Sequence, residues 1–238
     1  MNIEWAELRV RNLEIQRQFY TRVLGLQDLG DNWLGAGSQR LVHLVHTPQA
    51  QLAPPDRPGL YHLALVLPQR SHLASWLAHV LEQGIPIDGA SDHAVSEAIY
   101  LRDAEGNGLE VYWDRQPPPD VSRMTTRRLN LSDLLGQAEP YDGRAPQGTR
   151  VGHIHLQSPD LDFTSQFFAD LGLSLTMEMP GARFLAADDY HHHFAINQWN
   201  VGDFRDGLYT GLLAYSIRGQ LPSLQLQDPW GHQVYLQP

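Results

Sequence analysis

Several features are missing from this 238-residue sequence, and each absence narrows what the protein can do. There is no cysteine, which excludes disulfide bonds and thiolate metal sites, so any metal needs nitrogen and oxygen ligands. A formal charge of −10 and the lack of an Arg or Lys cluster argue against nucleic acid or an anionic membrane as a partner. No run approaches the roughly 18 apolar residues of a membrane span, and the charged start, MNIEWAELRVRN, is unlike a signal peptide. We therefore expect a soluble, cytoplasmic protein, in which twelve histidines are candidate metal ligands.

The first internal repeat joins a strand to a helix. AELRVRNLEIQRQFYTRVLGL (6–26) and HIHLQSPDLDFTSQFFADLGL (153–173) each combine a strand-like alternation with an amphipathic helical pattern that ends in Leu-Gly-Leu. Asn12 and Asp160 precede the two helices, where a short polar side chain accepts a free first-turn N–H. The match is too long to arise by chance, so both stretches are copies of one unit.

A second repeat begins with GLYHLALVLP (59–68) and continues through a helix, predicted to be capped by Ser71, to the turn in DAEGNGLEVYWD (103–114). Its echo runs from GLLAYSIRG (211–219) directly to DPWGHQVYLQP (228–238), so the helix of that copy is missing.

The repeats predict an α+β protein of four βαβββ modules, the last one truncated. The predicted bounds are 1–57, 58–117, 149–205 and 206–238 for the modules, and 118–148 for the connection between the second and third. Prolines and glycines mark that connection as irregular, with one short helix at 129–135. A connection of this length often covers a site.

The motifs in these modules resemble those of the vicinal oxygen chelate superfamily, which includes glyoxalase I, bleomycin-resistance proteins and type I extradiol ring-cleavage dioxygenases. The resemblance lies in the FY…LGL helix and in the turn before the last strand, with Asp103, Gly106, Asn107 and Glu110. Within the family, GHIHL and YHHH look most like catechol 2,3-dioxygenase-like proteins. The resemblance implies two cup-shaped mixed sheets with helices outside, and a divalent metal in a cup.

In this family the ligands come from the first strand of a module and from the acidic position before its last strand. The second module has His62 and Glu110 at those positions, and the third has His153. Pairing these two modules gives a two-histidine, one-carboxylate set, as in non-haem Fe(II) oxygenases. A lone strand histidine is more often a partly buried residue than a ligand, so the assignment depends on the set.

The other two modules have lost their ligand positions. Trp5 stands there in the first module, and Ala214 and Tyr235 stand there in the fourth. We therefore expect modules one and four to pair into a cup without a metal.

The resemblance also implies three catalytic positions. His192 corresponds to the acid–base histidine, and His93 and Tyr100 correspond to a histidine and a tyrosine that precede the ligand glutamate. Strand alternation would send His191 and His193 to the opposite face, as strand-edge residues. From the residues alone, His93 also suits a loop histidine and Tyr100 a core position.

His155 shares the predicted face of His153. It is either a group that supports a ligand or part of the cup lining, and we favour the lining.

These features predict an Fe(II)-dependent extradiol-type dioxygenase acting on a catecholic aromatic diol and O₂, with Mn, Zn or Ni as alternative metals. One alternative is a glyoxalase-like metal-dependent isomerase or lyase. The other is a non-enzymatic small-molecule-binding protein like the bleomycin-resistance proteins. A homo-oligomer is compatible with the sequence, which specifies neither the substrate nor the position of ring cleavage.

Overall fold

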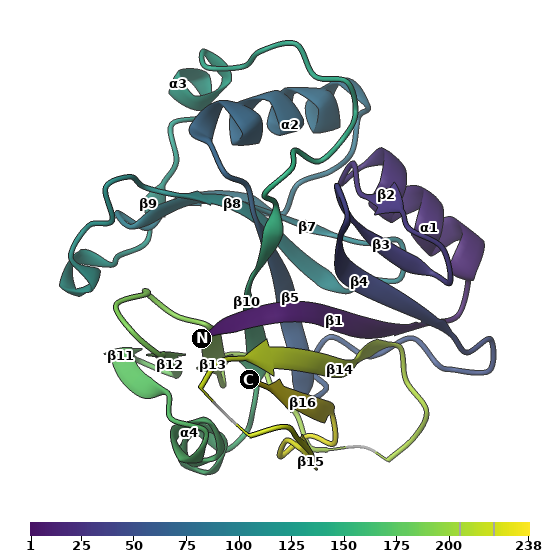
Figure 1. The fold of residues 1–238 in the computed structure, drawn as a ribbon, viewed down its shortest axis with the longest axis vertical. Helices are drawn as coiled ribbons and strands as arrows, with labels where there is room; N and C mark the ends of the chain where they lie inside the picture. The colour runs from purple at the N-terminus through teal and green to yellow at the C-terminus, as the bar shows by residue number, and fades with distance from the viewer. Residues whose placement is uncertain (205, 221) are drawn as a thin grey trace.

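The computed structural model describes residues 1–204, 206–220 and 222–238 as two mixed β-sheets with few helices (Figure 1). This confirms the predicted α+β class. No helix of the described residues has the length and apolar character that crossing a membrane requires.

The smaller sheet has the order β15-β16-β14-β1-β4-β3-β2 and the larger has the order β11-β12-β13-β10-β5-β8-β7-β6-β9. The strands of the smaller sheet are β1 (Asn2–Val10), β2 (Gln27–Asp28), β3 (Trp33–Ala36), β4 (Gln39–His46), β14 (Gly211–Arg218), β15 (Leu224–Gln227) and β16 (Gln233–Gln237). Those of the larger sheet are β5 (Gly59–Val66), β6 (Gly89–Asp92), β7 (Ser96–Arg102), β8 (Gly108–Asp114), β9 (Arg127–Arg128), β10 (Arg150–Gln157), β11 (Ser174–Met179), β12 (Ala182–Ala186) and β13 (Phe194–Asn197). The helices are α1 (Leu13–Arg22), α2 (Arg70–Glu82), α3 (Leu131–Leu135) and α4 (Leu161–Asp170), with a 3₁₀ turn η1 (Val121–Arg123).

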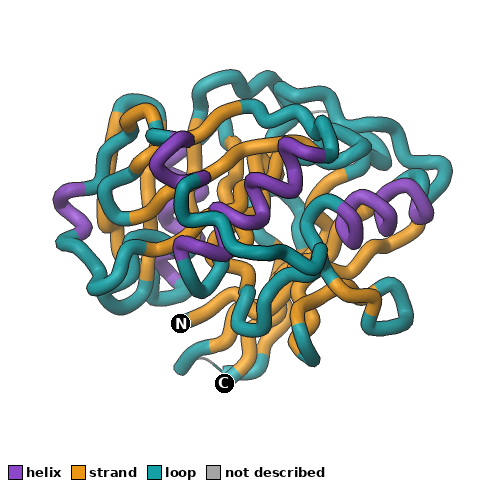
Figure 2. The backbone as a smooth tube through the Cα atoms, turned by 90° about the horizontal axis from the view of Figure 1, so that it is seen from above, coloured by secondary structure: helices purple, strands orange, loops and turns teal. Residues whose placement is uncertain are grey.

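Two antiparallel pairs form the centre of the molecule. β5 pairs with β10 in the larger sheet, and β1 pairs with β14 in the smaller one. β1 also contacts β10, and Figure 1 shows β1 and β14 passing in front of β5 and β10. The helices lie at the periphery, α2 and α3 at one end and α4 at the other (Figures 1 and 2). One continuous apolar core lies among these layers and includes Leu8, Leu63, Leu65, Ile154 and Tyr215.

The helix starts follow the predicted caps in two cases and depart from them in one. Asn12 Oδ1 accepts a hydrogen bond from Ile15 N at 3.1 Å, and Asp160 Oδ1 accepts one from Phe163 N at 2.9 Å. The Ser71 prediction was wrong: α2 begins at Arg70, so its N-cap is Gln69, two residues before Ser71, and Gln69 makes no side-chain capping bond. Gln69 has the right backbone for a cap but a side chain that is one methylene longer than that of Asn.

The repeated Asp-x-x-Gly turn is held by its aspartate. Asp103 accepts hydrogen bonds from Glu105 N, Asn107 N and Asn107 Nδ2 at 2.8–2.9 Å, and from Tyr20 OH at 3.2 Å. Asp228 makes the equivalent turn before β16. This turn aims β8 back along β5 and so places Glu110 next to the central pair.

The connection after β8 wraps around the larger sheet. β9 pairs with β6, and α3, which falls within the predicted helix at 129–135, packs on α2. η1 contacts β11, the strand at the opposite edge of the sheet. The connection therefore helps to close the curled sheet around its concave face.

The uncapped start of α2 predicts a stabilising substitution. Gln69→Asp should raise the free energy of unfolding by about 0.5–1 kcal/mol, because the exposed residue already has extended backbone and Asp would accept a first-turn N–H. Chemical denaturation measures this change, with Asp160→Ala, expected to cost about 1 kcal/mol, as the matched cap deletion. No gain from Gln69→Asp would mean that water already satisfies that helix end.

Candidate metal centre

Strand register brings three predicted ligands together. His153 lies opposite Ala64 in the β10–β5 pair, and Ala64 lies beside Glu110 in the parallel β5–β8 pair. His62 is two residues before Ala64 and therefore projects from the same face. The small side chain of Ala64 leaves room for the three longer ones to converge.

The polar atoms of these three residues converge on one point. His62 Nε2 lies 3.0 Å from Glu110 Oε2, His153 Nε2 lies 3.2 Å from the same oxygen, and the two nitrogens are 3.2 Å apart. Ligands held about 2.1 Å from an ion at right angles to one another are about 3 Å apart, so the spacing fits a divalent cation. All three residues are buried, and each offers one ligand atom within 4.8 Å of the other two.

The protonation states also suit a metal. Burial raises the pKa of Glu110, but the charge interactions and hydrogen bonds with His153 and His62 lower it by more. The pKa of Glu110 therefore lies well below its ordinary value. Burial lowers the pKa of His153 against the opposing pull of Glu110. Nδ1 of His153 is buried with no hydrogen-bond partner among the described residues, so its polar contacts run through Nε2. An ionised carboxylate beside a neutral imidazole is the state that metal binding requires.

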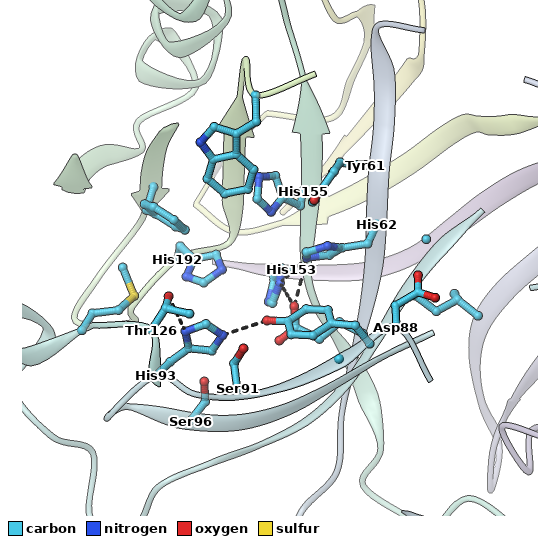
Figure 3. A pocket seen from close by; sticks show the side chains of 18 of the residues that line it. Tyr61, His62, Asp88, Ser91, His93, Ser96, Thr126, His153, His155 and His192 are labelled. Carbon is cyan, nitrogen blue, oxygen red and sulfur yellow. Dashed lines mark hydrogen bonds and ion pairs between the residues drawn. The ribbon is translucent and has the colours of Figure 1, made fainter. Parts of the chain in front are cut away.

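These three residues lie in a cavity of about 370 Å³ on the concave face of the larger sheet, which we call the cup (Figure 3). One wall is apolar and includes Met177, Met179, Phe184 and Trp199. The facing wall is polar, and Figure 3 shows Ser91, Ser96, His93 and Thr126 on it. A volume of this size is typical of a small-molecule site.

His93 and Tyr100, predicted as a pair, are hydrogen-bonded to each other in the cup wall. Tyr100 OH lies 2.7 Å from His93 Nε2, and His93 Nδ1 lies 2.9 Å from the carbonyl oxygen of Thr125. Since a carbonyl only accepts, Nδ1 carries the proton and Nε2 accepts from Tyr100. Burial and the charge of Glu110 raise the pKa of Tyr100 well above its ordinary value. The phenol is therefore protonated at neutral pH.

His192 lines the cup, with its ring centroid 4.3 Å from that of His153. Its Nδ1 lies 2.8 Å from Nδ1 of His191, and His191 Nε2 lies 2.8 Å from Asp114 Oδ1. Because the carboxylate accepts from His191 Nε2–H, Nδ1 of a neutral His191 accepts from His192 Nδ1–H. Nε2 of His192 is then left with its lone pair.

The expectation for His191 and His193 was wrong. Both are buried, because β13 begins only at Phe194 and the histidine triplet lies in the turn before it, where strand alternation does not apply. The sequence analysis also missed Asp114, which accepts hydrogen bonds from His191 and from Tyr190 OH. Its place four residues after Glu110 on β8, two positions along the same face, was the available signal.

His155 lies in the cup wall, as the sequence analysis favoured. It is buried, and its Nε2 is 2.9 Å from Nδ2 of Asn197. The Asn197 amide is the donor, so His155 Nε2 is an acceptor, and burial with nearby histidines lowers the pKa of His155 well below its ordinary value. Its ring packs against His62 and Tyr61 (Figure 3).

Aromatic side chains occupy the corresponding face of the smaller sheet. Trp5 packs edge-on against Trp33, with ring centroids 5.6 Å apart, and in a tilted arrangement against Tyr235, with ring centroids 5.3 Å apart. His43 lies beside Glu7 in the β1–β4 pair, the position that corresponds to Glu110 in the larger sheet. Its ring is stacked on Trp33, and its Nδ1 is hydrogen-bonded to the Glu7 carboxylate. In this sheet, packing occupies the positions where the larger sheet has polar ligand atoms.

Comparison with known proteins finds a family, a sequence relative and structures of similar fold. Residues 2–111 match the Glyoxalase/Bleomycin resistance protein/Dioxygenase superfamily. The catechol-2,3-dioxygenase of Bacillus subtilis (strain 168) is 38% identical over 215 residues, covering 83% of this chain and 75% of that protein. The structure of a proposed dioxygenase from Bacillus subtilis subsp. subtilis str. 168 superposes with a TM-score of 0.67 at 13% identity, covering 100% of this chain and 86% of the other. The structure of glyoxalase I from Zea mays superposes with a TM-score of 0.57 at 15% identity, covering 99% of this chain and 91% of the other. At these identities, both structures show likeness of fold alone.

The buried histidines predict that the metal-free protein loses stability in acid. Burial and the α-ammonium of Met1 lower the pKa of His193 to about 4. Between pH 6.5 and 4, His193 therefore binds a proton in the unfolded chain but not in the folded one. The contribution of neutral His193 to the free energy of unfolding is present above pH 6.5 and is lost as the pH falls toward 4. His193→Gln should reduce the slope of the free energy of unfolding against pH by about 1 kcal/mol per pH unit in that range, as measured by chemical denaturation. His46→Gln, at an exposed histidine, should leave the slope unchanged, and an equal slope in all three proteins would contradict the assignment.

A metal should stabilise the protein through both central strands. At about 100 times its Kd, anaerobic Fe(II) or Mn(II) should raise Tm by roughly 5–10 °C. His153→Ala should abolish this increase, whereas His155→Ala, on the same strand and face, should retain it. Differential scanning calorimetry of each variant with and without metal makes the comparison. An unchanged increase in His153→Ala would show that β10 gives no ligand.

Proposed function

This chain belongs to the glyoxalase/bleomycin resistance/dioxygenase superfamily, and we propose that it is an Fe(II)-dependent extradiol-type ring-cleavage dioxygenase that acts on a catecholic aromatic substrate and O₂. The observation that carries the proposal is the content of one cavity. His62, Glu110 and His153 converge there with His192 and with the His93–Tyr100 pair. A two-histidine, one-carboxylate set leaves coordination positions open, as a diol and O₂ require.

His62 Nε2, a Glu110 carboxylate oxygen and His153 Nε2 would hold the iron, in keeping with their spacing of 3.0–3.2 Å. A bound Fe(II) would supply open coordination positions for the diol and O₂ and a route for electron transfer between them. Mn, Zn and Ni also suit nitrogen and oxygen ligands, so the choice of iron rests on the reaction and on the catechol-2,3-dioxygenase relative.

His192 is the proposed acid–base group. Burial and the neighbouring histidines lower its pKa well below the ordinary value, so it is neutral at pH 7. The contacts from Asp114 through His191 leave the lone pair on its Nε2. That nitrogen can take a proton from a substrate hydroxyl and later return it, which is the role of a general base that becomes a general acid.

His93 and Tyr100 are proposed to orient the substrate. Thr125, in the connection after β8, fixes the His93 ring through its carbonyl oxygen, and His93 in turn fixes the Tyr100 hydroxyl. The phenol donates its hydrogen bond to His93 Nε2, so its oxygen can accept a hydrogen bond from a substrate hydroxyl, while Phe184 and Trp199 on the opposite wall suit the faces of an aromatic ring.

The glyoxalase-like alternative is less well supported by the side chains. Such chemistry usually uses a further glutamate ligand, and Glu97 on β7 is buried. Its carboxylate is instead paired with Arg70 at 2.8 Å and Arg115 at 2.9 Å. No second acidic residue joins the His62–Glu110–His153 group within the described part of the chain.

The proposal predicts oxygen consumption and ring cleavage. Protein loaded anaerobically with Fe(II) should take up O₂ with at least one catechol from a panel of alkyl- and aryl-substituted diols and form a coloured ring-opened product. His192→Gln should retain the metal but lower kcat by about 10²–10⁴-fold, the usual contribution of a positioned general base. Oxygen electrode traces and product spectra measure both. Metal-loaded protein that consumes no O₂ with any diol would contradict the proposal.

The contact through His191 predicts a role for Asp114. Asp114→Asn should lower kcat by about 10–100-fold, since the amide no longer fixes the His191 tautomer that orients His192. Asp88→Asn, at another acidic residue of the cup lining, is the matched control and should have little effect. Steady-state rates measured between pH 6 and 9 separate lost orientation from a shifted optimum. Equal rates for Asp114→Asn and the wild type would remove Asp114 from the account.

A further inference from the structure

A second cavity lies beside the cup and carries positive charge. Its volume is about 170 Å³, and Tyr61, Arg102 and Gly108 line both it and the cup. Arg9 lines it from β1, and Arg57 from the segment before β5. We propose that this cavity binds a small oxyanion with a carboxylate or phosphate group.

The two arginines lack a counter-charge among the described residues. Arg9 Nη1 donates to the backbone carbonyl of Tyr209 at 3.2 Å, and Arg57 Nη1 donates to that of Pro58 at 3.1 Å. Burial lowers the pKa of both, and the charge of Arg9 further lowers that of Arg57. Two partly buried cations that repel each other at one cavity are stabilised together when an anion enters it.

The other polar groups of the cavity are not paired with Arg9 or Arg57 among the described residues. Glu105, an acidic residue of the lining, accepts hydrogen bonds from the backbone N–H groups of Arg11 and Asn12 at 2.7–3.0 Å. Arg57 Nε and Trp230 Nε1 are buried donors without a hydrogen-bond partner among the described residues. Unpaired buried donors are uncommon in folded proteins, and they favour a ligand that accepts hydrogen bonds.

The aromatic neighbours of Arg57 offer a competing explanation. Its guanidinium lies 5.0 Å from the ring centroid of Tyr209 and 5.4 Å from that of Phe204, and such contacts stabilise a cation without an anion. They involve Arg57 alone, whereas Arg9 shares the cavity. The volume is below the roughly 300–1,000 Å³ of drug-sized sites, which suits a small anion better than a nucleotide.

Thermal unfolding titrations test the proposal. The probes are sodium phosphate and sodium succinate, each titrated at constant ionic strength set with sodium chloride. Wild-type protein should show a Tm that rises and saturates with at least one of the two anions. Arg57→Gln and Arg9→Gln should each raise the apparent Kd about tenfold or more, because each removes a charged donor. Arg183→Gln, at a surface arginine paired with Glu178 and Asp162, should behave as wild type.

Saturation with phosphate alone would assign the cavity to phosphate groups, and saturation with succinate alone would assign it to carboxylates. No saturable increase in wild type, or equal Kd values in Arg57→Gln, Arg9→Gln and Arg183→Gln, would overturn the proposal and leave the aromatic contacts as the explanation. If one arginine variant does not fold, the other still gives the comparison. The readout needs neither metal nor turnover, so its failure is separate from a failure of the proposed dioxygenase function.

Discussion

The antiparallel pairing of β5 with β10 is the constraint on which the site depends, because its register decides which side chains enter the cup. His153 lies across from Ala64, and β8 brings Glu110 to the other side of the same alanine. A slip by one residue would turn His153 toward the apolar core and bring Ile154 into the cup. The core residues on the opposite face, such as Leu63 and Leu65, exclude that slip, so ordinary packing fixes the geometry of the polar site.

The smaller sheet shows what the same architecture does without a converging set of metal-ligand atoms. β1 pairs with β14 as β5 pairs with β10, but Trp5 and Tyr235 fill the equivalent face with packed aromatic rings. Aromatic rings pack well in several relative orientations, whereas metal ligands must be held at fixed distances from one another. Burying histidine and carboxylate groups close together is unfavourable unless a proton or a metal lies between them. The cluster of His62, Glu110 and His153 in the larger sheet therefore points to a bound ion.

The Asn12 and Asp160 caps and the grouping of the strands into two sheets could be predicted from the sequence because they follow from periodicity and from matching motifs. The pairing of the second module with the third needed one further step, namely that Trp5 and Ala214 offer no ligand atom. The sequence could not show the Asp114–His191–His192 contacts, since they join β8 to an irregular turn 77 residues later. Nor could it show the cavity with Arg9 and Arg57, which forms only when β1 meets the segment before β5. Local patterns predict elements, whereas contacts between irregular segments need the folded chain.

The central claim is that β5, β8 and β10 share one metal. Crystals of protein loaded anaerobically with Fe(II), measured on both sides of the iron absorption edge, test it most directly through the anomalous difference map. A metal shared by the three strands should give one strong peak per chain within bonding distance of His62 Nε2, a Glu110 carboxylate oxygen and His153 Nε2. A peak elsewhere, or a peak that lacks a ligand from β5 or from β10, would contradict it.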